Sequence, residues 1–181
     1  MFPDLSGLQT AGTPNNNFFM KKFFIFFCFL FSFFSICLSQ NYDVDSLLNI
    51  IILKQNIIRG NLEIPVLEKS DMLENIAKEE TKMLCQNPYN YRVREDYGVN
   101  IYRGTKFPEA DEVINLWIRE QRHYRGNEIT EQGILNFGHY TQIIWRQTTV
   151  IGCSMSQTKG GMYIIVCLYS PKGNIIGQKP H

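Results

Sequence analysis

The chain carries the octapeptide Gly-His-Tyr-Thr-Gln-Ile-Ile-Trp at residues 138–145, followed shortly by Ile-Gly-Cys at residues 151–153. A second distinctive stretch, Tyr-Ile-Ile-Val-Cys-Leu-Tyr-Ser-Pro-Lys-Gly-Asn-Ile-Ile-Gly-Gln-Lys-Pro, occupies residues 163–180. The local structure of residues 139–145 is ambiguous, because a two-residue period and a helical period both fit so short a run. The segments on either side of these stretches have clearer patterns.

Two segments in the second half of the chain have the composition of β-strands. Residues 149–155 and 162–169 are rich in β-branched and aromatic side chains, and Lys159-Gly160-Gly161 lies between them. This arrangement predicts an antiparallel hairpin. A short strand at residues 100–102 is a further candidate for the same sheet.

The first half of the chain has the apolar spacing of helices. We expect the first helix to be capped by Asp45 or Ser46 and to stop at Gly60, and the second to be capped at Ser70. Pro108 is tolerated at the start of a third helix, because the first-turn amide has no intrahelical partner. The predicted bounds are 45–59, 71–84 and 108–124. Helices first and antiparallel strands later indicate an α+β layered domain.

The amino-terminal region resembles an export signal. Lys21-Lys22 precede an apolar run at residues 23–38, and small or polar Ser39-Gln40 follow it. This order is typical of a secretory signal peptide, whereas a membrane anchor needs roughly 20 apolar residues. Residues 1–19 precede the basic pair and suggest that translation starts at Met20. We therefore divide the chain into a leader of doubtful origin (1–19), a signal peptide (20–39) and one secreted, extracellular domain (41–181).

Composition narrows the classes of partner. The chain has 181 residues and a formal net charge of +1, which suggests one domain without the basic face that nucleic acid requires. No membrane contact is expected after the signal is removed. Cys85, Cys153 and Cys167 remain in the domain, so two of them can pair in an oxidising compartment and one is left over.

The two stretches quoted first closely resemble the hallmark motifs of the CAP superfamily. Its members include the cysteine-rich secretory proteins, the insect venom antigen 5 proteins, the plant pathogenesis-related 1 proteins and the secreted venom-allergen-like proteins of parasitic worms. The resemblance extends upstream to Trp117-Ile118-Arg119-Glu120, to Gly98-Val99-Asn100-Ile101, and to Gln55-Asn56 with Arg59. It thus covers nearly all of residues 45–180.

The resemblance implies a CAP-type α-β-α sandwich with three helical elements and a small antiparallel sheet. It assigns residues 139–145 to a short helix. It also implies a disulfide between Cys153 and Cys167, which lie on the two strands of the predicted hairpin. Cys85 is then free or forms an intermolecular bond.

The resemblance further implies a shallow pocket with two His and two Glu that hold a divalent metal, often zinc, in many relatives. The corresponding positions here are Gln55, Val99, Glu120 and His139. Only Glu120 and His139 have side chains that commonly bind zinc. We therefore expect no cofactor, and the alternative is a weak divalent-metal site. Glu120 and His139 could instead form a structural pair, and Gln55 a hydrogen-bonded core amide. His123, three residues from Glu120, is a minor ligand candidate.

These residues predict a non-enzymatic module that binds a ligand or an extracellular protein. The resemblance adds lipid or sterol binding and modulation of another organism's responses as candidate activities. The alternative is a metal-dependent hydrolase or protease that uses Glu120 and His139, and a third reading is a purely structural extracellular module. Trp117 and Trp145 are either core residues or platforms for a ligand, and the core role is the commoner one.

Overall fold

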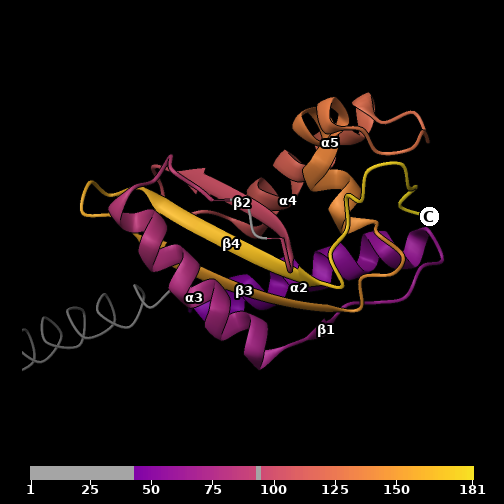
Figure 1. Cartoon of the computed structure of the whole chain (residues 1–181). Coiled ribbons are helices and arrows are strands. Elements are labelled where there is room, and N and C mark those ends of the chain that lie inside the picture. The colour runs from indigo at the N-terminus through magenta and orange to yellow at the C-terminus, as the bar shows by residue number, and fades with distance from the viewer. Residues whose placement is uncertain (1–42, 93–94) are drawn as a thin grey trace, which may run out of the picture. The chain divides into compact units, whose positions relative to one another are not determined.

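The computed structural model describes residues 43–92 and 95–181 (Figure 1). The predicted leader and signal peptide lie outside these residues. None of the described helices combines the length and the apolar composition needed to cross a bilayer. In chain order the elements are α2 (Val44–Asn61), β1 (Glu68–Lys69), α3 (Asp71–Gln86), β2 (Gly98–Gly104), α4 (Ala110–Ile118), the 3₁₀ helix η1 (Arg119–His123), α5 (Glu131–Ile143), β3 (Val150–Gln157) and β4 (Tyr163–Ser170).

The strands form one four-stranded sheet in the order β1-β3-β4-β2. The predicted hairpin is present, because β3 and β4 pair antiparallel, and β2 pairs antiparallel with the other side of β4. The expected antiparallel sheet is thus present, and the short β1 adds a parallel pair with β3 that makes the whole sheet mixed. Asn56 of α2 explains the position of β1: its amide exchanges two hydrogen bonds with the backbone of Leu67, directly before the strand.

Helices cover both faces of the sheet and give the expected α-β-α sandwich (Figure 1). On one face α3 packs its apolar side, including Leu73 and Leu84, against Ile164, Val166 and Leu168 of β4. The larger core lies on the opposite face, where α2, α4 and α5 meet the sheet. Alternation along β4 places Ile165, Cys167 and Tyr169 in this second core.

The first two predicted helices are present with shifted ends. Helix α2 begins at Val44 and is capped by Asp43, whose side chain accepts from the Asp45 amide, and not by Asp45 or Ser46. It also continues past Gly60, because Leu62 closes its last turn. Helix α3 begins after Ser70, whose hydroxyl accepts from the Leu73 amide as expected.

The third and fourth helical segments differ more from expectation. Helix α4 begins at Ala110 rather than at Pro108 and tightens into η1 from Arg119. The short helix expected over residues 139–145 is present and ends at Ile143. Most of these residues form the second half of α5, which begins at Glu131 and is kinked at Phe137, where the backbone is non-helical. The first half of α5 was not predicted, although Thr130 provides an ordinary capping side chain for it.

Candidate functional site

Arg59 of α2 anchors the segment that follows α5. Its guanidinium is fully buried and donates to the carbonyls of Pro65 (2.6 Å), Ile143 (2.8 Å), Trp145 (2.9 Å) and Thr148 (2.8 Å). Burial lowers the pKa of Arg59 to about 10, so the group remains charged at neutral pH. The end of α5 is therefore tied to α2 through main-chain atoms.

Glu120 of η1 holds the kink in α5. One carboxylate oxygen accepts from the backbone amides of His139 (2.8 Å) and Tyr140 (3.2 Å), which head the second half of the helix beyond Phe137. The other oxygen lies 2.6 Å from Nδ1 of His139. A carboxylate only accepts hydrogen bonds, so Nδ1 carries the proton and Nε2 is left for other contacts. Glu120 thus caps a helix and also orients the imidazole.

Two further contacts fix His139. Trp117 stacks on its ring with centroids 6.0 Å apart and an interplanar angle of 11°. The Asn100 amide of β2 donates to the His139 carbonyl at 3.1 Å. Trp117 and Trp145 are both fully buried, which is the core role considered for them above. His139 is therefore a positioned side chain at the boundary between the core and the surface.

The four positions taken from the resemblance do not form one cluster. Glu120 and His139 contact each other, and both side chains are partly exposed. Gln55 is fully buried in α2, where it accepts a hydrogen bond from the Tyr169 hydroxyl at 2.8 Å. Burial is the main reason that the pKa of Tyr169 is raised well above its usual range, so this hydroxyl stays a donor. Gln55 is therefore a core residue and is not among those that line the surface pocket described next.

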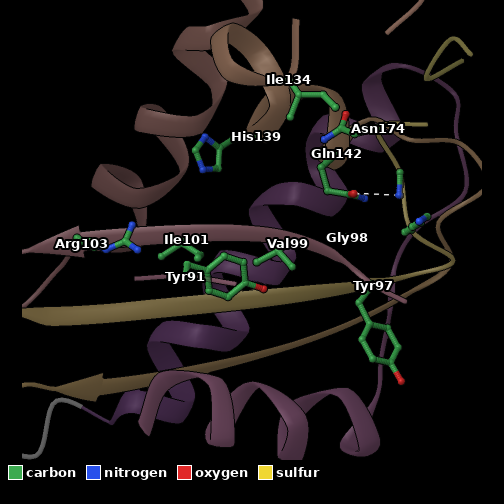
Figure 2. A pocket seen from close by; sticks show the side chains of 12 residues that line it. Tyr91, Tyr97, Gly98, Val99, Ile101, Arg103, Ile134, His139, Gln142 and Asn174 are labelled. Atoms are coloured by element: carbon green, nitrogen blue, oxygen red, sulfur yellow. Dashed lines mark hydrogen bonds between the residues drawn. The ribbon is translucent and has the colours of Figure 1, made fainter. Parts of the chain in front are cut away.

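A pocket of about 460 Å³ lies beside strand β2 (Figure 2). Val99 and His139 are the two sequence-predicted residues that line it, whereas Glu120 supports it from behind His139. The lining residues are Tyr91, Tyr97, Gly98, Val99, Ile101, Arg103, Ile134, His139, Gln142, Lys172, Gly173 and Asn174. The two distinctive stretches of sequence contain Gln142, Lys172 and Asn174, so those motifs could have pointed to them. Nothing in the sequence singled out Arg103.

The amides of the pocket wall are already satisfied by the protein. Gln142 accepts from the Gly173 amide at 3.0 Å and donates to the Thr148 hydroxyl at 3.2 Å. Asn174 accepts from Thr141 at 2.6 Å and donates to the Gly138 carbonyl at 2.8 Å. These bonds hold the wall rigid and leave the two amides little capacity to bind a ligand.

The pocket lining contains three basic residues. These are Arg103, His139 and Lys172, and none of the described lining residues is Asp or Glu. Arg103 donates its Nε hydrogen to the Pro88 carbonyl at 2.8 Å, which leaves its terminal nitrogens available. Among the described residues neither Arg103 nor Lys172 forms an ion pair. The pocket therefore offers a positive surface above apolar side chains.

The same residues do not suit zinc or nucleophilic catalysis. No three His, Cys, Asp or Glu side chains of residues 43–92 and 95–181 lie close enough to share a metal ion. Val99 has no donor atom, Gln55 is in the core, and His123 lies on the exposed end of η1, where it accepts from Arg122. The described lining contains no Ser, Thr or Cys nucleophile either. The Glu120–His139 pair has the groups needed to move a proton.

The comparisons with known proteins agree with this architecture. Residues 53–169 match the sequence profile of the family described as CAP, the cysteine-rich secretory protein family. Pathogenesis-related protein 1C of Nicotiana tabacum is 30% identical over 128 residues, covering 70% of this chain and 76% of the relative. Venom allergen 5 of Polistes fuscatus is 37% identical over 101 residues, covering 54% of this chain and 48% of that protein.

Among solved structures, the venom allergen-like protein 4 of Schistosoma mansoni has the same fold. Its TM-score is 0.52 at 22% identity, and the match covers 68% of this chain and 84% of that one. The hallmark stretches, the two-faced sandwich and the matched profile lead to one assignment: the chain belongs to the CAP family of cysteine-rich secretory proteins.

Proposed function

We propose that this CAP domain is a secreted, non-enzymatic binding module whose pocket takes an organic anion without a metal ion. The observation that carries the proposal is the pocket lining, in which Arg103, His139 and Lys172 accompany apolar Val99 and Ile101. No Asp or Glu is among the described lining residues, and the one carboxylate bonded to them, that of Glu120, is paired with His139 behind the wall. A ligand that combines a negative charge with an apolar body matches this surface. Fatty acids belong to this class, whereas a neutral sterol would leave the cations unpaired.

Secretion is part of the proposal. The apolar run at residues 23–38 and the disulfide between Cys153 and Cys167 both favour an oxidising, extracellular compartment. The candidate activity of modulating another organism's responses requires such a location. An extracellular partner would reach the pocket through its open side.

The first test is a zinc titration of the purified protein by calorimetry. We expect no site with submicromolar affinity, because a tight zinc site needs about four donors, or three and a water. Ligand binding should also survive treatment with a chelator. A submicromolar zinc site, or loss of binding after chelation, would contradict the proposal and favour the hydrolase alternative.

The second test uses a defined organic anion, 8-anilinonaphthalene-1-sulfonate, followed by its fluorescence. Saturable binding should weaken when Lys172 is replaced by Ala, because the replacement removes one of the two free cations of the pocket. The matched control is Lys179→Ala, since Lys179 is exposed on the same carboxy-terminal segment but does not line the pocket. Equal binding by both variants would argue against the pocket as the anion site.

A further inference from the structure

The pocket extends around an open edge of the sheet. Strand β2 is the last strand of the sheet, so only β4 pairs with it. Asn100 of β2 points toward α5, where it donates to His139, and the neighbouring Val99 and Ile101 pack with the cluster under α3. Because one pocket is lined by both His139 and Ile101, it must reach past the outer edge of β2 (Figure 2).

The pairing register shows which backbone groups face that edge. Cys153 and Cys167 are direct partners in β3 and β4 with Cα atoms 4.1 Å apart, a separation typical of a pair that exchanges no backbone hydrogen bonds. The backbone groups of Cys167 therefore face β2 and bond its partner there, Asn100. The Ile151 carbonyl supports this register, because it accepts from Ser70 on the β1 side, away from β4.

By alternation, the N–H and C=O groups of Val99, Ile101 and Arg103 point away from β4. These three are also the β2 residues, apart from Gly98, that line the pocket. Among the described residues, no hydrogen bond joins their backbone to anything outside the sheet. The pocket thus contains a row of strand hydrogen-bonding groups to which no described residue outside the sheet bonds.

We infer that the pocket binds an extended peptide that adds to β2 as a fifth strand and carries an acidic group near each end. This inference rests on the proposed function, for which it names the ligand class. The three outward-facing residues span roughly 14 Å at about 3.4 Å per residue, which corresponds to about five residues of extended peptide. Backbone bonds would supply affinity, and the charges at the two ends would supply selectivity.

The two free cations lie at opposite ends of this row. Arg103 is the last of the three outward-facing residues. At the other end, Lys172 precedes Gly173, whose amide donates to the Gln142 side chain. That side chain lies against Gly98, the first residue of β2. A peptide lying along β2 would therefore meet a positive side chain at each end and no described carboxylate in the lining between them.

The test uses a fluorescent pool of peptides, acetyl-Glu-X-X-X-Glu-amide with mixed residues at the three X positions, and follows anisotropy at low salt. Two matched pools serve as controls, one with all three X amides N-methylated and one with Lys in place of both Glu. We expect the acidic pool to bind at least tenfold more tightly than either control. Equal binding of the N-methylated pool would overturn strand addition, and equal binding of the Lys-ended pool would overturn the charge assignment.

A protein variant tests the same edge from the other side. Ile101→Pro removes one outward-facing N–H group without removing a bond to β4, a position where an edge strand tolerates proline. It should weaken binding of the acidic pool at least tenfold, whereas Ile101→Val should change it less than twofold. Binding of the pool to Ile101→Pro with unchanged affinity would overturn the inference.

Amide hydrogen exchange gives a readout that does not depend on the proline variant folding. In the free protein, the amides of Val99, Ile101 and Arg103 should exchange faster than those of Asn100 and Tyr102. Saturation with the acidic pool should slow the three outward-facing amides at least tenfold and leave the other two unchanged. No slowing at any of the three would overturn the inference.

Binding of 8-anilinonaphthalene-1-sulfonate distinguishes failure of the strand-addition inference from failure of the proposed function. If the dye binds through Lys172 and the peptide pool does not bind, the pocket takes small anions and strand addition is wrong. Capture by phosphatidylserine vesicles without peptide binding would likewise assign the site to lipid. If neither dye nor peptide binds, both the proposed function and this inference fail.

Discussion

At the scale of single residues, Arg59 supports the site from outside it, unlike Val99 and His139, which line the pocket. It contacts nothing in the pocket, yet it fixes carbonyls on both sides of the turn that follows α5. This turn leads into β3 and supports Thr148, which in turn bonds the pocket residue Gln142. A buried side chain of α2 therefore determines the shape of the pocket at a distance.

Replacing Arg59 with Lys should destabilise the protein by roughly 3 kcal/mol or more, because an ammonium cannot reach four separate carbonyls and would leave buried acceptors unpaired. Equilibrium unfolding in urea measures the change. Arg146→Lys is the matched control, since Arg146 is exposed on the same turn, and it should shift stability by less than about 0.5 kcal/mol. Similar losses for both variants would contradict the anchoring role of Arg59.

At the scale of elements, the sequence predicts what periodicity and local chemistry determine. The capping hydroxyl of Ser70, the hairpin of β3 and β4, and the strand around Ile101 all follow from short-range patterns. The kink at Phe137 does not, because it depends on Glu120, a side chain from another element. Strand β1 has only two residues, too few for any alternation to appear.

The candidate site was predictable to the same extent. Glu120 and His139 were identified because their motifs are distinctive, and the structure places them in contact. Gln55 was grouped with them because aligned positions say nothing about how deeply a side chain is buried, and Gln55 is fully buried. Arg103 was missed because its importance comes from the open edge of β2, and strand order cannot be inferred from residue spacing.

The disulfide between Cys153 and Cys167 acts within the hairpin. Replacing both cysteines with Ala should cost roughly 3 kcal/mol, on a loop-entropy argument for the 14-residue separation. Urea unfolding of the double variant measures this cost. Cys85→Ala should change stability by less than about 1 kcal/mol, because Cys85 is partly exposed and its thiol is unpaired. Peptide mapping without reductant that joins Cys85 to either of the other cysteines would contradict the assignment.

At the scale of the whole molecule, the described domain from residue 43 onward forms its own compact unit. It contains two apolar cores, one on each face of the sheet.

We expect the exported protein to begin near Gln40 or Asn41, because the apolar run ends at Leu38 and small Ser39 follows it. Amino-terminal sequencing of protein recovered from the medium of expressing cells measures this directly. A secreted product that retains residues 23–38 would contradict the signal peptide, and retention of the full chain in the membrane fraction would indicate an anchor.

The bonds of Arg59 also have a consequence for how related sequences can diverge. All four of its acceptors are main-chain oxygens, which every amino acid supplies. Substitutions at positions 65, 143, 145 and 148 therefore leave these acceptors in place. These positions should show no pairwise covariation with position 59. A saturation library would find position 59 nearly intolerant of replacement, while statistical coupling between positions would fail to reveal why.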